Sequence, residues 1–263
     1  MRQFIFVVAI VALPRATEPA PSVIPDFSGL WAHTPIAEYQ ALPGKPGPVW
    51  DQKHPLSPTD FSVAWEGNDD NPILQPWTAA EVRKHAEAAH AGTPIPSPQE
   101  VCQPSGVPNV ITLPAPVQFI QQPNEIVILY QRDHQLRHIY MNVTHSANPA
   151  TSWYGESIGH YEGDTLVIDT IGMNDKTPVD LFGTPHTEAL HVVERYRLID
   201  DGSQLEVVFT VEDSQAFTTA WSARMVYGRA NGQALTEEIC AENNIDVVTK
   251  QPYPIPVATN PAF

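Results

Sequence analysis

Positively charged residues are scarce in this chain of 263 residues. Its 14 lysines and arginines stand against 30 aspartates and glutamates, which gives a formal net charge of −16. Such a surface would repel a nucleic-acid duplex or an anionic bilayer, and no basic run offsets the total. The composition therefore argues against a nucleic-acid partner and favours a neutral or cationic small organic molecule. The composition does not indicate an oligomeric state.

Phosphate-binding and nucleophile motifs are also lacking. The sequence has neither a glycine-rich dinucleotide fingerprint nor a phosphate-binding loop. The pentapeptide Gly155-Glu-Ser157-Ile-Gly159 matches G-x-S-x-G, but it falls inside an expected strand and lacks the strand-to-helix turn of a nucleophile elbow. Ser157 as an acyl nucleophile is therefore kept only as an alternative.

A single long apolar run is present, MRQFIFVVAIVAL at the start of the chain. One arginine followed by apolar residues is typical of a secretory signal, and the run is too short to span a bilayer as a helix. No clear cleavage triplet follows it, so an uncleaved anchor remains an alternative. We expect a signal peptide over residues 1–20 and a secreted or periplasmic protein that has no membrane contact after cleavage.

The two cysteines, Cys102 and Cys240, would then meet an oxidising compartment, where they could pair. Such a bridge would close a long loop, which stabilises by about 4 to 5 kcal/mol in the chain-entropy model. The alternative is a pair of buried thiols.

Proline is unevenly distributed along the chain. Twenty of the 27 prolines lie in the first 125 residues, and proline lacks the N–H group that a strand ladder needs. Residues 21–124 are therefore predicted to wrap as extended coil around another part of the chain. A helix near 78–91 interrupts this wrap, because Thr78-Ala-Ala-Glu81 fits a capping box and Gly92 follows as a stop signal.

Strand-like runs separated by short turns dominate after Pro123. They pair as EIVILYQRD with QLRHIYMNV, WYGESIGHYEG with DTLVIDTIG, LHVVERYRLID with SQLEVVFTVED, and WSARMVYGR with LTEEICAEN. This pattern predicts an all-β protein, with an antiparallel up-and-down β-barrel over 125–250 and a C-terminal tail over 251–263. A small barrel of this kind can hold one small ligand. A β-sandwich is the alternative.

Several blocks resemble those of a large group of exported bacterial proteins of uncharacterised function. The blocks are DFSGLW, SIGHYEGDTLVIDT, GMNDKT, TPHTEALHVVERYR and CAENN, and they cover most of the chain from Asp26 to Asn244. The resemblance implies an exported location and a candidate site, but no particular reaction. Gly29-Leu30-Trp31 bears a weak resemblance to the start of a lipocalin-like barrel.

The candidate catalytic residues lie between Thr151 and Leu198. Strand alternation puts His160 and Glu162 on one face, and a carboxylate beside an imidazole orients the ring and raises its basicity. We expect His160 to act as general base or acid, Glu162 to orient it, and His191 or His186 to polarise the substrate in one shared pocket. This set predicts a cofactor-independent lyase or isomerase.

Five further polar residues are expected to bind the substrate. They are Asp175 and Lys176 in the loop after GMN, Glu188 before the third run, and Glu194 and Tyr196 facing inward from it. Asp175 and Lys176 could equally pin their own loop, and Glu194 could instead form a structural ion pair with an arginine.

Two other classes of function remain open. In one, His160, His186 and His191 bind a divalent transition metal with Glu188 or Glu194, as in a metal-dependent hydrolase, although their spacing matches no standard motif. In the other, the protein is a non-catalytic small-molecule binding protein whose polar residues only satisfy a ligand.

Overall fold

The computed structural model describes residues 24–33, 40–49, 67–246 and 250–257, so the expected signal peptide lies outside the described residues. Its strands are β1 (Gly29–Ala32), β2 (Gln40–Ala41), β3 (Val117–Gln121), β4 (Glu125–Tyr130), β5 (Leu136–Met141), β6 (Glu156–Glu162), β7 (Thr165–Ile171), β8 (His191–Ile199), β9 (Gln204–Glu212) and β10 (Trp221–Arg229). The helices are α1 (Pro76–His90), α2 (Asn109–Thr112) and α3 (Cys240–Asn243), and single 3-10 turns are η1 (Pro98–Val101), η2 (Arg132–His134) and η3 (Asp200–Gly202).

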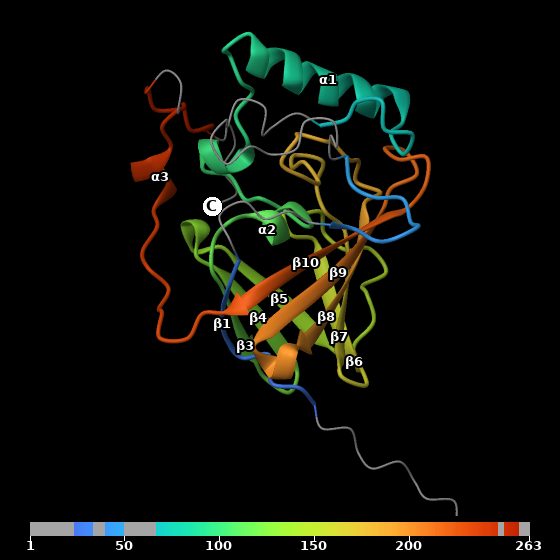
Figure 1. Ribbon diagram of the computed structural model, residues 1–263, viewed down its shortest axis with the longest axis vertical. Helices are drawn as coiled ribbons and strands as arrows, with labels where there is room; N and C mark the ends of the chain where they lie inside the picture. The colour runs from blue at the N-terminus through green and yellow to red at the C-terminus, as the bar shows by residue number, and fades with distance from the viewer. Residues whose placement is uncertain (1–23, 34–39, 50–66, 247–249, 258–263) are drawn as a thin grey trace, which may run out of the picture.

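The strands close into a nine-stranded barrel, which confirms the predicted fold class (Figure 1). Closure depends on β1, which pairs with β3 on one side and with β10 on the other. Trp31 of β1 lies opposite both Val117 and Arg229. Each barrel strand pairs with a neighbour on both sides, so no barrel strand has an edge that is entirely unpaired.

One pair of neighbouring strands departs from the expected antiparallel meander. β5 and β6 run parallel, with Tyr140 opposite Ile158. A parallel pair needs a connection long enough to return the chain to the starting end of the sheet, and residues 142–155 provide it. The hairpins β4–β5, β6–β7 and β8–β9 are antiparallel, as predicted.

The fourth predicted hairpin is wrong. WSARMVYGR forms β10, but LTEEICAEN contributes no strand and contains α3. The partners of β10 are β1, β2 and β9, so its edges are already occupied. The barrel therefore begins earlier than the expected boundary at residue 125, because the proline-rich half supplies β1 and β3.

The Cys102–Cys240 disulfide is confirmed, with the two Cα atoms 5.4 Å apart. It joins the residue after η1 to the first residue of α3, which holds α3 beside the proline-rich half rather than in the sheet. Within the described ranges, no helix is both long enough and apolar enough to cross a membrane.

The predicted helix forms as α1, but the expected capping box does not. The helix begins at Pro76, whose fixed φ and missing N–H suit the first helical turn. Thr78 is buried and its hydroxyl donates to the carbonyl of Ala216 at 2.8 Å. The threonine therefore fastens the helix to the β9–β10 connection instead of capping it.

Side chains fill the interior of the barrel. Alternate residues of β4, β8 and β9 are buried, as expected for strands with one inward face. The largest fully buried side chains include Trp31, Trp221, Phe209 and, unusually, Arg137. A barrel interior that carries an arginine needs an internal acidic partner.

Candidate functional site

His160 and Glu162 lie together on the outer wall of the barrel. Their side chains are 49% and 48% exposed, and His160 Nε2 lies 3.1 Å from Glu162 Oε1. Arg195 of β8 also donates to Glu162. Hydrogen bonds from Arg195 and then His160 lower the pKa of Glu162. The expected pair is therefore formed, but as part of a surface ion cluster rather than inside a pocket.

His186 is buried and both of its ring nitrogens have partners. Nδ1 lies 2.8 Å from the carbonyl oxygen of Thr187, and Nε2 lies 3.1 Å from the hydroxyl of Thr177. A neutral ring with its proton on Nδ1 satisfies both contacts. Burial lowers the pKa of His186, which favours that neutral form. His186 thus has the surroundings of a structural histidine.

The third predicted histidine, His191, is separated from His160 along the wall. His160 lies opposite Val167, which lies opposite Arg195 on β8. His191 is four residues before Arg195, a rise of about 13 Å along a strand. The shared pocket of His160, His186 and His191 is therefore not formed. Alternation grouped the residues of each strand by face correctly, but the expectation that His160, Glu162 and His191 face an enclosed pocket is wrong, since they lie on the outer wall. Alternation also could not align the heights of separate strands.

His191 instead belongs to a row of alternating acids and imidazoles. His191 Nε2 and His145 Nε2 lie 3.0 and 2.9 Å from the same atom, Asp169 Oδ1. The far nitrogen of His145 lies 2.9 Å from Glu156 Oε1, and that of His191 lies 3.3 Å from Glu212 Oε2. We call this set the acid–imidazole row: Glu156, His145, Asp169, His191 and Glu212.

Neighbouring strands place the row on the outer wall. Its carboxylates come from β6, β7 and β9, and His191 is the first residue of β8, directly opposite Glu212. His145 comes from the β5–β6 connection. The backbone N–H and hydroxyl of Ser146 donate to Glu156 at 2.7 and 2.6 Å, which fastens this connection to β6. These bonds are the main reason why the pKa of Glu156 is lowered.

The four contacts of the row need more N–H donors than two neutral imidazoles provide. A neutral ring has one N–H, yet both nitrogens of each histidine face a carboxylate oxygen. A ring forms hydrogen bonds through both of its nitrogens only when it carries two protons or when one of its two carboxylate partners is protonated. With both rings charged, the row holds three negative and two positive charges, a net −1. Such an arrangement can store a proton and pass it between sites.

Sequence reasoning missed His145, Glu156, Asp169 and Glu212. The outward position of Asp169 on β7 could have been predicted from alternation, because Leu166, Ile168 and Thr170 occupy the buried face. His145 carries no such signal, since its connection has no periodic pattern. Only the parallel β5–β6 arrangement brings it over β7.

The predicted loop residues lie elsewhere on the surface. Asp175, Lys176 and Glu188 are exposed. The Lys176 ammonium lies 5.6 Å from the centroid of the Trp153 ring, and the Lys176 backbone N–H donates to the Asn174 side chain. The loop after GMN is thus fastened by its own contacts.

Glu194 and Tyr196 face the interior, where Glu194 pairs with Arg137. Arg137 Nη1 donates to Glu194 Oε1 at 3.0 Å, Nη2 bonds the other carboxylate oxygen, and the Tyr196 hydroxyl donates to Oε1 at 2.8 Å. Burial alone would lower the pKa of Arg137, but the Glu194 carboxylate raises it overall, so the guanidinium keeps its charge. This is the structural ion pair that the sequence left as an alternative.

Ser157 belongs to the same interior cluster. Its hydroxyl lies 3.0 Å from Arg137 Nε and 3.0 Å from Thr170 Oγ1, and the residue is 2% exposed. Catalytic nucleophiles need an adjacent base and access for a substrate, and Ser157 contacts an arginine instead. The structure therefore gives no support to the acyl-nucleophile alternative.

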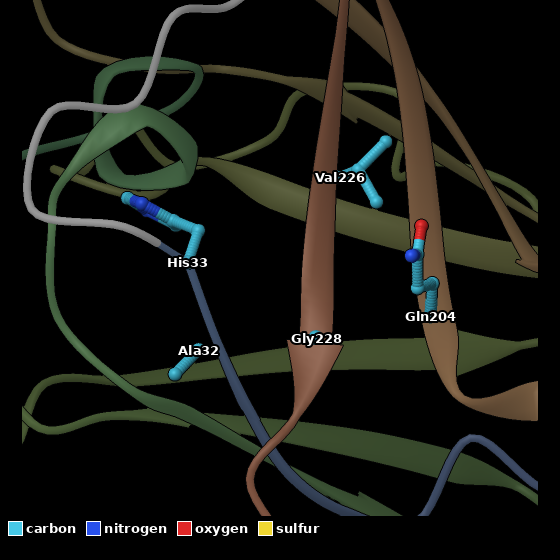
Figure 2. A pocket seen from close by; sticks show the side chains of 5 residues that line it. All are labelled: Ala32, His33, Gln204, Val226 and Gly228. Atoms are coloured by element: carbon cyan, nitrogen blue, oxygen red, sulfur yellow. The ribbon is translucent and has the colours of Figure 1, made fainter.

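Among the residues that the structure describes, no group of three or more histidines, cysteines or acids is arranged to hold a metal ion. A shallow, open pocket of about 440 Å³ lies at β1, β9 and β10, lined by Ala32, His33, Gln204, Val226 and Gly228 (Figure 2). None of the predicted site residues lines it.

No protein-family model matches the chain, and no curated protein matches it either. A solved structure, that of the REP1-NXSQ fatty acid transporter, aligns with 45% of this chain and 72% of its own, at 11% sequence identity and a TM-score of 0.28. A similarity this low does not establish a shared fold or function. The functional proposal therefore depends on the geometry alone.

Proposed function

We propose that this protein is an exported, cofactor-independent lyase or isomerase that uses the acid–imidazole row for general acid–base chemistry on a small organic molecule. The observation that carries the proposal is the shared contact of His145 Nε2 and His191 Nε2 with Asp169 Oδ1. A carboxylate that orients an imidazole is the arrangement general bases need. In this row one carboxylate contacts two imidazoles, that of His145 from the β5–β6 connection and that of His191 from β8.

The substrate end of the row is the Nδ1 atom of His191. Its contact with Glu212 is the longest of the row at 3.3 Å, and the Glu212 side chain is 53% exposed. A substrate can therefore displace Glu212 without disturbing the contact between His191 Nε2 and Asp169. In the active form Nε2–H donates to Asp169, and Nδ1 carries a lone pair.

The reaction begins when His191 Nδ1 removes a proton from a carbon next to a carbonyl group. The electron pair of the broken C–H bond moves toward the carbonyl oxygen, and the positive charge on His191 is stabilised by Asp169. In an isomerase the proton returns to a neighbouring carbon; in a lyase it leaves with a hydroxyl group as water. The three carboxylates of the row favour a neutral or cationic substrate over an anionic one.

The test is exchange of carbon-bound protons in deuterium oxide, followed by NMR over a panel of small neutral and amine-bearing carbonyl compounds. We expect wild-type protein to exchange at least one compound, and His191→Gln to lose about a hundredfold to ten-thousandfold of that rate. His160→Gln is the matched control, since it removes an exposed histidine with a carboxylate partner from the same wall. Equal losses in both variants, or full activity in His191→Gln, would contradict the proposal, as would wild-type exchange no faster than that of free imidazole.

A further inference from the structure

A buried segment occupies the upper end of the barrel. Residues 105–113, which we call the plug, are all buried, and they include α2, which lies beneath α1 at the end of the barrel (Figure 1). The side chains of Val107, Val110 and Ile111 are at most 2% exposed. Barrels of about this size either fill their interior with side chains or hold one small ligand there. The plug thus lies where such a ligand would enter.

The plug contacts the interior through a bond that a ligand could replace. Tyr227 faces inward from β10, and its hydroxyl donates to the backbone carbonyl of Ile111. Inside a barrel, a carbonyl or hydroxyl oxygen of a small molecule can accept the same hydrogen bond. The Tyr227 hydroxyl is therefore a ready donor once the plug moves.

A second tyrosine provides independent evidence. Tyr130 is 4% exposed, and its buried O–H group has no hydrogen-bond acceptor in the part of the chain that the structure describes; its neighbour Arg137 can only donate. It lies within electrostatic range of Tyr227 and of the Arg137–Glu194 pair. Burial raises the pKa of Tyr130 to about 12, so the group keeps its proton and can donate. Buried polar groups without a partner are rare and call for one.

We propose that a small apolar molecule with one hydroxyl or carbonyl group binds in the space that the plug fills, and that the ligand enters when the plug moves out. Tyr227 donates to the ligand oxygen in place of the Ile111 carbonyl, and Tyr130 provides a second donor. This site is separate from the acid–imidazole row and does not rest on the proposed enzyme activity.

Gly106 offers a way to shift the plug without touching the ligand site. Its φ is +69°, and a Cβ there would lie 2.5 Å from the Thr177 hydroxyl oxygen. Gly106→Ala should therefore disfavour the closed plug. Because the apparent affinity is the intrinsic affinity multiplied by the open fraction, this variant should bind an apolar probe about tenfold more tightly.

Gly163 provides the matched control. Its φ is +64°, nothing lies within 4 Å of an added Cβ, and it sits in the β6–β7 turn. Gly163→Ala carries a similar backbone strain away from the plug, so probe affinity should not change. Tyr227→Phe is the second plug variant, which removes one plug bond while keeping the ring.

The probe is N-phenyl-1-naphthylamine, which has no oxygen and fluoresces when buried. We expect one site per chain, tighter binding in Gly106→Ala and Tyr227→Phe than in wild type, and faster amide hydrogen exchange over 105–113 with the probe bound. If Gly106→Ala fails to fold, Tyr227→Phe decides. The proposal is overturned if neither folded plug variant binds more tightly, if Gly163→Ala tightens equally, or if the bound probe leaves exchange of the plug unchanged.

The polar end of the ligand is tested by competition. We expect 1-naphthol to displace the probe better than naphthalene, and Tyr130→Phe to reduce that preference about threefold to tenfold, the loss of one neutral hydrogen bond. Equal displacement by the two compounds in wild-type protein would overturn the assigned ligand chemistry.

Discussion

Glu194 and Arg195 are consecutive residues of β8, and they form ion pairs on opposite sides of the barrel wall. Glu194 faces inward and pairs with Arg137, where both side chains are at most 1% exposed. Arg195 faces outward and pairs with Glu162, where both are close to half exposed. Two adjacent residues of one strand therefore take part in two acid–arginine ion pairs, one buried inside the barrel and one exposed to solvent.

This contrast predicts very different costs of breaking each pair. Glu194→Gln leaves the Arg137 charge buried without its partner, so it should lower the free energy of unfolding by about 3 to 5 kcal/mol. Glu162→Gln breaks a solvent-screened pair and should have little or no effect on stability. Urea unfolding of both variants checks the prediction.

A double variant separates the burial of charge from the loss of contacts. Arg137→Met with Glu194→Leu removes both charges and should be more stable than either Glu194→Gln or Arg137→Met alone. If the double variant is instead as unstable as the sum of the two single changes, the pair is not coupled and the interpretation is wrong.

Alternation along single strands was the part of the structure that the sequence could predict. It placed Glu194 and Tyr196 on the inner face of β8, and it paired the strands of three hairpins. The partner of Glu194 was harder to predict. Arg137 shares one face of β5 with Ile139 and Met141, and all three side chains are buried. Which inner face an arginine meets depends on closure of the barrel, which local patterns do not encode.

The failures of prediction have the same physical origin. His160 and His191 lie on outward faces, but their heights on the wall depend on strand register across β6, β7 and β8. His145 is positioned by a connection that exists only because β5 and β6 are parallel. LTEEICAEN has strand-like residues, yet the Cys102–Cys240 disulfide and the occupied edges of β10 keep it out of the sheet.

Asp180 should make stability depend on pH. It is fully buried and accepts bonds from Phe182 N, Thr184 N and the Thr184 hydroxyl; burial nevertheless raises its pKa from 3.8 to about 6. The folded state therefore binds the proton more tightly than the unfolded state. The stabilisation from this group is fully present below pH 3.8 and is lost as the pH rises through about 6, a change of about 3 kcal/mol.

Asp180→Asn tests this prediction, because the amide cannot ionise. Relative to wild type, the variant should gain about 2.4 kcal/mol of unfolding free energy between pH 4 and pH 7.5, measured by urea unfolding at both pH values. Asp164→Asn, at an exposed turn, is the control and should show no such gain. A constant difference between Asp180→Asn and wild type at the two pH values would refute the assignment to Asp180.

The disulfide should contribute strongly to stability, because it joins residues 138 positions apart in the chain. A loop of that length corresponds to about 5 kcal/mol in the chain-entropy model. Cys102→Ser with Cys240→Ser should lower the unfolding free energy by an amount of this order, and reduction of the wild-type protein should give a similar loss. A loss below about 1 kcal/mol would mean that the unfolded chain is already compact without the bridge.

The acid–imidazole row predicts a spectroscopic coupling between two histidines that are distant in sequence. Asp169→Asn replaces the carboxylate whose Oδ1 contacts both His145 Nε2 and His191 Nε2 with an uncharged amide. Both rings lose a charge-assisted hydrogen bond at once, so the nitrogen-15 chemical shifts of both imidazoles should change. His160, whose partner is Glu162, should keep its shifts and serves as an internal control. A change confined to one of the two rings would show that Asp169 does not bridge them in solution, and the proposed doubling of the base would then lose its physical foundation.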